Sequence, residues 1–267
     1  MPEPFEVHRP PAAPRLPGKV VVRPDAGDTC DALATDVVSQ AAACIRQFGD
    51  FHIALSGGGT PLPLYQLLMF DPDYRALNWR KTHLWIVDER RVPFDDARSN
   101  YQQIHEIIVE HSDIPKDQVH PILATRDDAD THYEQALRES LEWREKGQDR
   151  LDCVILGMGG DGHTASLFPR SRALRDGSTP PRMVLINSGP EVTPPDRVTM
   201  TQHLINASRM VCVLVTGEAK RATIARVAAA TAGGDPATSV ADELPILSIK
   251  PKAGELRWYL DADACPR

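Results

Sequence analysis

Hydrophobic residues along the chain form short continuous runs that alternate with longer stretches of helical spacing. The short runs predict strands at 19–22, 51–55, 83–87, 118–122, 151–156, 183–186 and 210–215, with edge strands at 246–249 and 256–260. The longer stretches predict helices over 29–48, 61–69, 99–109, 127–146 and 218–232. Strands that alternate with helices in this way favour an α/β fold: a doubly wound, mostly parallel sheet with helices on both faces.

Glycines and ionisable residues gather directly after four of the predicted strands. The segments are 56–61, 88–93, 157–163 and 216–220. The carboxyl ends of parallel strands meet at one edge of a sheet, where open α/β folds bind their ligands. The sequence therefore predicts one crevice, lined by these four loops.

The glycine-dense turn at 157–163 is the strongest candidate for chemistry. Gly157, Gly159 and Gly162 satisfy the G-x-G-x-x-G spacing of a dinucleotide site, but the acidic residue expected about 20 positions later would fall near Arg182. A nicotinamide or flavin site is therefore not favoured. The plainer alternative is a turn with His163 as a capping or surface histidine. The neighbouring carboxylate and the strand-end position favour a catalytic role for His163 instead.

The loop at 56–61, Ser-Gly-Gly-Gly-Thr-Pro, has the character of an anion site. Thr60 suits the N-cap of the following helix and Pro61 its first turn, so that free backbone N–H groups and the helix dipole would face one point. No Lys-Ser or Lys-Thr follows the glycines, which excludes a P-loop. The alternative is an ordinary tight turn between a strand and a helix.

Charged residues follow two other strands. Asp88, Glu89 and Arg90 end one of them, and Lys220 lies in the first turn of the helix predicted from 218. Such residues are most often solvated, but an arginine fork fits a phosphate or a carboxylate, and a bound anion would explain a cation near a helix N-terminus.

Composition narrows the class of protein. With 42% hydrophobic and 25% charged residues, the 267-residue chain is typical of soluble globular proteins. Its formal net charge of −7 argues against a nucleic-acid partner. The five scattered cysteines contain no C-x-x-C pair and predict free thiols in a reducing compartment, the cytoplasm.

The same reading predicts the organisation of the chain. No apolar run reaches about 18 residues and the N-terminus has no signal-peptide core, so no membrane association is predicted. No obligate protein partner is predicted either. The segment 1–18 contains six prolines and predicts an extended, poorly ordered arm, which leaves 19–267 as a single α/β domain.

Five segments then carry a resemblance to a known family: Ser-Gly-Gly-Gly-Thr-Pro (56–61), Val-Asp-Glu-Arg-Arg-Val-Pro (87–93), Gly-Met-Gly-Gly-Asp-Gly-His-Thr-Ala-Ser-Leu-Phe-Pro (157–169), Arg-Val-Thr (197–199) and Gly-Glu-Ala-Lys (217–220). In this order they resemble the 6-phosphogluconolactonase family and, more distantly, the glucosamine-6-phosphate deaminases. The resemblance implies a Rossmann-like fold of the glucosamine-6-phosphate deaminase and ribose-5-phosphate isomerase type. It also implies hydrolysis of 6-phospho-D-glucono-1,5-lactone to 6-phospho-D-gluconate in the oxidative branch of the pentose phosphate pathway.

One position separates the two families. The deaminases have a glutamate before the proline of the long motif, where this chain has Phe168. A phenyl ring cannot carry a proton, so the lactonase is favoured over a deaminase, an isomerase or a non-catalytic sugar-phosphate-binding protein. The segment 244–248, Leu-Pro-Ile-Leu-Ser, departs from the Leu-Pro-Ala-Ser that is frequent in the lactonases, and leaves that wall of the pocket less well defined.

Roles follow for the candidate residues. His163 would activate water as a general base and Asp161 would orient its ring, without metal or cofactor. The phosphate of the sugar lactone would lie on the loop of Ser56, Gly57, Gly58 and Thr60, with Arg197 and Lys220 converging on it. Arg90 is assigned to the phosphate or the lactone. Asp88 either contacts sugar hydroxyls or, with Glu89, holds the arginines in place.

Overall fold

The computed structural model describes residues 12–234 and 237–267, and its centre is a seven-stranded sheet. In spatial order the strands are β1 (Lys19–Arg23), β10 (Glu255–Asp261), β9 (Met210–Val215), β6 (Cys153–Leu156), β2 (Phe51–Leu55), β3 (Thr82–Ile86) and β5 (Val119–His120). Every neighbouring pair is parallel. The predicted mostly parallel sheet is confirmed.

The middle of this sheet explains the compact apolar runs of the sequence. All residues of β2, β6 and β9 are buried, because layers of structure cover both faces of a parallel sheet and leave no polar side to the strand. Such strands read as continuous hydrophobic segments, which is why the sequence placed them correctly.

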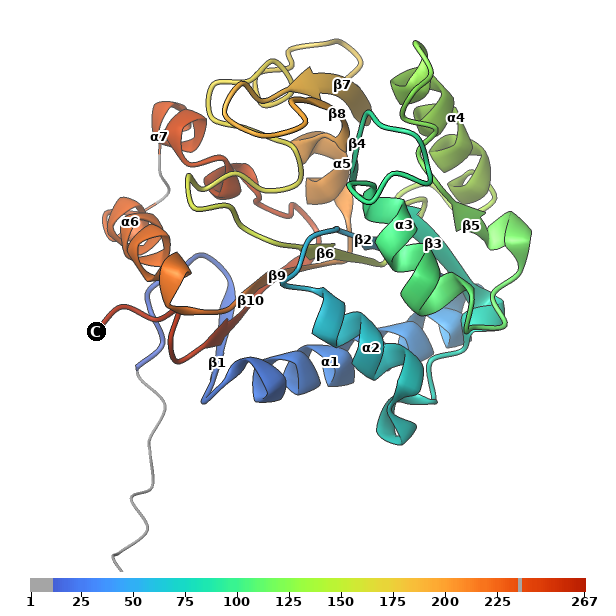
Figure 1. The fold of residues 1–267 in the computed structure, drawn as a ribbon, viewed down its shortest axis with the longest axis horizontal. Coiled ribbons are helices and arrows are strands. Elements are labelled where there is room, and N and C mark those ends of the chain that lie inside the picture. The colour runs from blue at the N-terminus through green and yellow to red at the C-terminus, as the bar shows by residue number, and fades with distance from the viewer. Residues whose placement is uncertain (1–11, 235–236) are drawn as a thin grey trace, which may run out of the picture.

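Helices and a smaller sheet cover the two faces. Figure 1 shows α1 and α2 on one side of the sheet, and α4, α5 and α7 on the other. The helices are α1 (Ala26–Phe48), α2 (Leu62–Phe70), α3 (Asn100–Ile104, continued by a π-helical turn His105–Val109), α4 (Ala129–Leu141), α5 (Gln202–Ala207), α6 (Arg221–Thr231) and α7 (Thr238–Glu243). Short 3₁₀ turns lie at Pro72–Tyr74, Trp79–Lys81, Lys116–Gln118, Glu218–Lys220 and Pro245–Ser248. In the described part of the chain, none of the helices has the length and apolarity that crossing a membrane requires.

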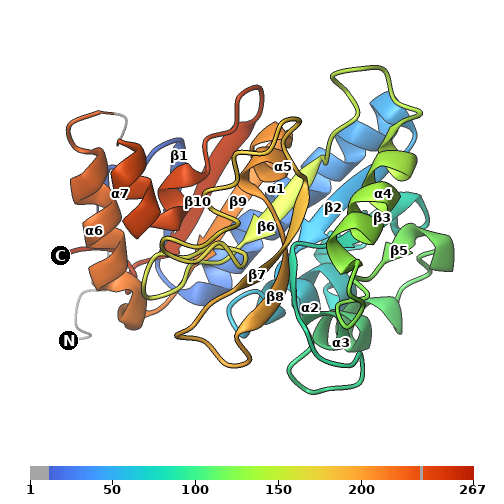
Figure 2. The ribbon, with the colours of Figure 1, turned by 90° about the horizontal axis from the view of Figure 1, so that it is seen from above.

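A second, antiparallel sheet lies over the carboxyl side of the first (Figure 2). It consists of β4 (Asp88–Arg90), β8 (Asp196–Met200) and β7 (Val184–Ser188), in the order β4-β8-β7. The sequence predicted only β7 among these, and placed it in the main sheet. It missed β4 and β8 because they are short and carry charged residues that break the hydrophobic pattern.

Two further expectations were wrong. The predicted edge strand at 246–249 is the 3₁₀ turn Pro245–Ser248, where Pro245 cannot donate a strand hydrogen bond. The strand β10 is not at an edge, since it lies between β1 and β9. After His163 the chain makes a tight turn closed by a bridge between Thr164 and Leu167.

The N-terminal segment is only partly described. Residues 1–11 of the predicted arm lie outside the described residues, but the end of that segment is packed. Leu16 is buried in the core and Trp258 Nε1 donates a hydrogen bond to the Pro17 carbonyl at 2.8 Å. The extended arm predicted up to residue 18 is therefore too long by at least these residues.

Candidate active site

The four predicted loops meet because their strands are neighbours. They follow β9, β6, β2 and β3, which lie side by side in the sheet. The chain runs outward from β2 to β3 on one side and from β6 to β9 on the other, so this is the topological switch point where such sheets bind ligands. A cavity of about 360 Å³ opens there. Its lining includes Ser56, Gly57, Gly58, Thr60, Asp88, Arg90, Asn100, Gly160, His163 and Lys220.

The loop after β2 forms one wall of this cavity. Ser56 Oγ donates to the Ile155 carbonyl at 2.8 Å, and Tyr65 Oη donates to the Ser56 carbonyl at 2.6 Å, so the loop is fixed at its base. Gly58 has φ +92°, a conformation that side chains rarely adopt. The expected N-cap was wrong by one residue: Pro61, which has no side-chain hydroxyl, occupies the N-cap of α2. Thr60 instead lines the cavity.

The glycine turn after β6 holds the ionisable pair. His163 Nδ1 lies 2.6 Å from Asp161 Oδ1, and the backbone N–H of His163 donates to the same oxygen at 3.0 Å. A Cβ atom on Gly159 would overlap with His163 Nδ1, so glycine is required there for the pair to form. The side chains of His163 and Asp161 are 28% and 36% exposed, and the imidazole therefore remains within reach of a ligand.

Hydrogen bonding sets the protonation of this pair. Burial alone would raise the pKa of the Asp161 carboxyl, but the hydrogen bonds from the ring and backbone of His163 outweigh it and lower the pKa. An ionised Asp161 is an acceptor for an Nδ1–H group, and an imidazole in that tautomer carries its lone pair on Nε2. This geometry is the one that an orienting carboxylate and a general base require.

Phe168 lies between His163 and Arg197. Its ring centroid is 5.1 Å from that of the imidazole, and the Arg197 Cζ atom lies 6.0 Å from the phenyl centroid. Arg197 is buried, donates to the Pro194 carbonyl, and lies beside the cavity rather than in its lining. Burial lowers the pKa of its guanidinium. Of the predicted cationic residues, Arg90 and Lys220 therefore line the cavity and Arg197 does not.

The strand β4 presents two carboxylates with different surroundings. The Glu89 carboxylate accepts from the backbone N–H groups of Asn100 and Tyr101 and from the Ser99 hydroxyl, so it caps α3; burial raises its pKa. Asp88 is buried at the cavity wall and accepts from Ser166 Oγ at 2.6 Å. In the described part of the chain, neither carboxylate forms an ion pair with Arg90, whose Nη1 donates to the Arg98 carbonyl.

Lys220 closes the far side of the cavity. The loop after β9 turns at Gly217, with φ +90°, whose N–H donates to the Asp261 carboxylate at 2.9 Å. The predicted helix begins as the 3₁₀ turn Glu218–Lys220, and Lys220 is the N-cap residue of α6. Lys220 therefore lines the cavity from the start of this helix.

Sequence reasoning missed two residues of the site. Asn100 was seen only as the start of a helix, yet it lines the cavity, packs on Gly57, and donates from Nδ2 to the Asp88 carbonyl at 2.7 Å. Ser166 was part of the long motif but received no role. The available signal for Asn100 was its position directly after the helix-capping Ser99, shortly after a charged strand end. No sequence spacing connects Ser166 with Asp88.

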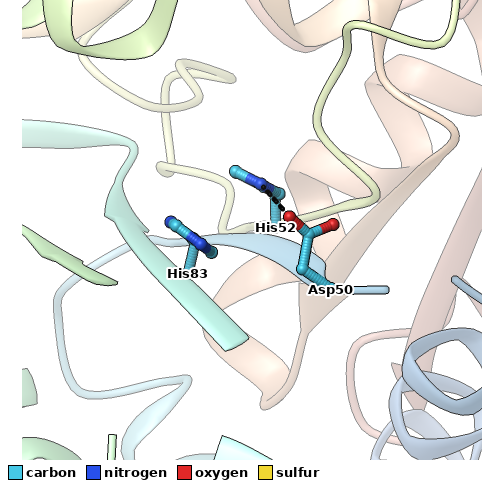
Figure 3. Close-up of side chains that lie close together, drawn as sticks. All are labelled: Asp50, His52 and His83. Atoms are coloured by element: carbon cyan, nitrogen blue, oxygen red, sulfur yellow. Dashed lines mark hydrogen bonds and ion pairs between the residues drawn. The ribbon is translucent and has the colours of Figure 1, made fainter. Parts of the chain in front are cut away.

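One cluster elsewhere has residue types that bind metals. Asp50, His52 and His83 lie at the amino ends of β2 and β3, and their potential ligand atoms are all within 4.8 Å of one another (Figure 3). The two rings are stacked, with centroids 4.3 Å apart and planes inclined by 10°. An imidazole binds a metal through a lone pair in its own plane at about 2 Å, so nearly parallel stacked rings cannot share one ion.

The hydrogen bonds of His52 agree with that conclusion. Trp85 Nε1 donates to its Nδ1 at 3.1 Å, and its Nε2 lies 3.3 Å from Asp50 Oδ2. Both ring nitrogens are therefore engaged within the protein. This cluster is a partly buried hydrogen-bonded stack, and the metal-independent mechanism stays a prediction.

Comparison with known proteins places the chain in a family. Residues 24–258 match the family of glucosamine-6-phosphate isomerases and 6-phosphogluconolactonases. The chain belongs to this family. It is 37% identical to a 6-phosphogluconolactonase of Synechocystis over 232 residues, which cover 85% of this chain and 89% of that protein. The structure of 6-phosphogluconolactonase from Trypanosoma cruzi matches with a TM-score of 0.75 at 27% identity, covering 95% of this chain and 98% of the other.

A longer relative matches only in part. The human GDH/6PGL endoplasmic bifunctional protein is 36% identical over 240 residues, or 87% of this chain. The chain spans 28% of the length of that protein. The alignment does not extend over the rest of the bifunctional protein.

Proposed function

We propose that this chain hydrolyses 6-phospho-D-glucono-1,5-lactone to 6-phospho-D-gluconate, a step of the oxidative branch of the pentose phosphate pathway. The observation that carries the proposal is the Asp161–His163 pair beside a cavity whose lining includes His163, the glycines of the 56–61 loop and Lys220. That combination suits a substrate with a phosphate at one end and an ester carbonyl at the other. The family supports the same choice, since its Synechocystis member is a 6-phosphogluconolactonase.

The chemistry needs two proton transfers by one group. His163 Nε2 removes a proton from water while the water oxygen attacks the lactone carbonyl carbon, and Asp161 stabilises the imidazolium that forms. The tetrahedral intermediate then collapses: the bond between the carbonyl carbon and the ring oxygen breaks, and the imidazolium returns its proton to that oxygen. The products are a carboxylic acid, which ionises, and a free hydroxyl.

A donor for the oxyanion is available in the glycine turn. The N–H groups of Gly159 and Gly162 are used inside the turn, donating to the His163 and Gly159 carbonyls. Gly160 lines the cavity, and its N–H makes no hydrogen bond to the described residues. We assign it to the oxyanion, because a preorganised backbone donor costs no rearrangement when charge develops.

The phosphate is assigned to the other end of the cavity. The loop of Gly57, Gly58 and Thr60, held in place through Ser56, provides backbone and hydroxyl donors, and Lys220 provides a cation. Arg90 lines the wall between the two ends and serves either the phosphate or the lactone. Arg197 would join the phosphate only if its guanidinium turned from Phe168 toward the cavity.

Phe168 argues against the ring-opening chemistry of a deaminase. It occupies the position next to the histidine where a proton-carrying glutamate would be needed, and its ring packs 5.1 Å from the imidazole. Gly189 makes room for this ring, since a Cβ atom there would lie 2.6 Å from Phe168 Cε2. The structure therefore accommodates an apolar side chain, Phe168, next to His163.

The setting of the enzyme is proposed on the same evidence. One hydrophobic core extends from Leu16 to Cys265, which supports a single domain over 19–267. All five cysteines are buried free thiols, which supports a reducing compartment, and we propose the cytoplasm. The proposed reaction requires no cofactor, metal, nucleic acid or obligate protein partner.

The decisive measurement is the consumption of freshly generated 6-phosphogluconolactone, corrected for its spontaneous hydrolysis, by metal-stripped protein. We expect rapid hydrolysis by the wild type and a loss of about a hundredfold or more in kcat for His163→Ala. The control is His203→Ala, which removes an exposed histidine outside the cavity lining. If the wild type does not accelerate hydrolysis, the lactonase proposal fails and glucosamine 6-phosphate is the next substrate to test.

A further inference from the structure

The Asp88 carboxylate is held by a residue from a different loop. Ser166 Oγ donates to Asp88 Oδ2 at 2.6 Å, and both side chains are buried, Ser166 being only 1% exposed. A hydrogen bond of this length between a hydroxyl and a carboxylate is of the strong, charge-assisted kind. It connects the end of β3 to the loop that carries His163, across 78 residues of sequence.

Ser166 is itself fixed on both sides. Its backbone N–H donates to Thr199 Oγ1 at 3.1 Å, and its carbonyl accepts from Asn187 Nδ2 at 2.7 Å. Thr199 and Asn187 belong to the antiparallel sheet that covers this side of the molecule. The hydroxyl of Ser166 is therefore presented to Asp88 by a rigid support.

This arrangement decides which carboxylate oxygen faces the ligand. A free aspartate can rotate about χ2 and present either oxygen. With Oδ2 bound to Ser166, the second oxygen, Oδ1, makes no hydrogen bond to the described residues, and the residue lines the cavity. A carboxylate oxygen accepts hydrogen bonds and repels a phosphate, so its natural ligand here is a hydroxyl group.

We propose that Ser166 is a positioning residue that holds Asp88 so that Oδ1 accepts a hydrogen bond from a hydroxyl of the sugar. The inference rests on the proposed function and adds to it the group that recognises the polyol part of the substrate. Phosphate-binding donors and a hydroxyl-binding carboxylate at separate points of the same cavity favour one orientation of the sugar phosphate. That orientation delivers the carbonyl carbon to His163.

The test separates hydroxyl recognition from phosphate recognition. Calorimetric titration with 6-phosphogluconate and, separately, with inorganic phosphate is performed on the wild type and on Ser166→Ala. We expect the dissociation constant for 6-phosphogluconate to rise about tenfold or more, because the Asp88 carboxylate is no longer held with Oδ1 toward the sugar hydroxyl, and that for inorganic phosphate to stay unchanged. Equal losses for both ligands, or no loss for either, would overturn the proposal.

Matched variants keep the test independent of folding. Ser208→Ala removes another fully buried serine hydroxyl, which donates to the Leu204 carbonyl outside the cavity lining, and should leave both affinities unchanged. Ser166→Cys keeps the shape with a weaker donor and should give an intermediate affinity for 6-phosphogluconate. Should Ser166→Ala not fold, Ser166→Cys provides the same comparison between the two ligands.

A double-mutant cycle tests whether Ser166 acts through Asp88. If it does, Asp88→Ala combined with Ser166→Ala binds 6-phosphogluconate no more weakly than Asp88→Ala alone. Additive losses would contradict the inference. Hydrolysis of the lactone by the wild type is measured beside each titration. If the wild type is active and Ser166→Ala binds 6-phosphogluconate as tightly as the wild type does, only the role of Ser166 is refuted. If the wild type is inactive, the proposed function is refuted.

Discussion

Asn100 packs directly on the Cα atom of Gly57, so that a Cβ atom at position 57 would overlap with the Asn100 side chain. Asn100 cannot turn away freely, because its Nδ2 donates to the Asp88 carbonyl and its backbone N–H donates to Glu89. The anion loop after β2 and the charged strand β4 are thus in direct contact. The glycine is needed for this close approach rather than for an unusual φ.

This contact predicts that Gly57→Ala disrupts the phosphate end of the site. The added methyl group must displace Asn100 or shift the loop, and the affinity for inorganic phosphate should fall about tenfold or more. Gly59→Ala is the control in the same loop, because a Cβ atom there meets nothing within 4 Å. Calorimetric titration with phosphate compares them; similar affinities in the two variants would show that the contact is unimportant.

Gly159 is predicted to be essential for the catalytic pair. A Cβ atom there would overlap with His163 Nδ1 and lie 2.6 Å from Asp161 Oδ1, so Gly159→Ala should separate the two side chains. We expect kcat for the lactone to fall about a hundredfold, with less change in KM. Gly177→Ala, at an exposed turn where a Cβ atom has open space, serves as the reference. Wild-type kcat in Gly159→Ala would rule out the assignment of this pair.

Lys220 should contribute to binding more than to turnover. Removing its charge from the cavity wall by Lys220→Ala is expected to raise KM about tenfold while kcat changes little, and to weaken the dependence of KM on ionic strength. Lys252→Ala changes an exposed lysine outside this cavity and controls for net charge. Steady-state kinetics at low and high salt measure both effects; a fall in kcat at unchanged KM would place Lys220 at the reacting carbonyl instead.

The stacked rings of His83 and His120 predict acid sensitivity. Burial lowers the pKa of His83 from 6.5 to about 4 and that of His120 to about 3, and the two rings share a 3.1 Å hydrogen bond. Below about pH 6.5 these two histidines bind protons in the unfolded chain. In the folded chain they bind protons only when the pH approaches their lowered pKa values. The free energy of unfolding should therefore be insensitive to these histidines above that pH and fall below it, by roughly 1 kcal/mol per pH unit and histidine at most.

Urea denaturation between about pH 8 and about pH 5 measures this dependence. The double variant His83→Gln with His120→Gln should lose much of the slope below about pH 6.5. His203→Gln, which changes an exposed histidine, should keep it. An unchanged slope in the double variant would mean that other groups control acid denaturation.

The main sheet could be predicted from the sequence because its signal is local. Fully buried strands such as β2 and β9 are continuous apolar runs, and the loops after them are marked by glycine. All strands of a parallel sheet have their carboxyl ends at the same edge. The loops could therefore be expected to meet there without knowledge of the strand order. The cavity lining accordingly contains Ser56, Gly57, Gly58, Thr60, Asp88, Arg90, His163 and Lys220 as predicted, while Asp161 contacts His163 from outside it.

The small sheet and its consequences depend on long-range contacts. The strands β4 and β8 carry charged residues, and their pairing with each other and of β8 with β7 defines them as strands. That pairing also places Arg197 beneath Phe168 rather than in the cavity lining. Ser166 and Asp88 are likewise joined only in three dimensions, and no periodicity or motif spacing encodes such a bond.

The two ends of the central strands serve different purposes. The residues of the pocket follow the strands at one edge of the sheet, whereas His52 and His83 stand near the starts of β2 and β3 at the other. The histidines at the amino ends of these strands can therefore be replaced to change the tolerance of acid without altering residues of the pocket. Conversely, the loops can be varied to accept other sugar phosphates without changing the histidines for which acid sensitivity is predicted.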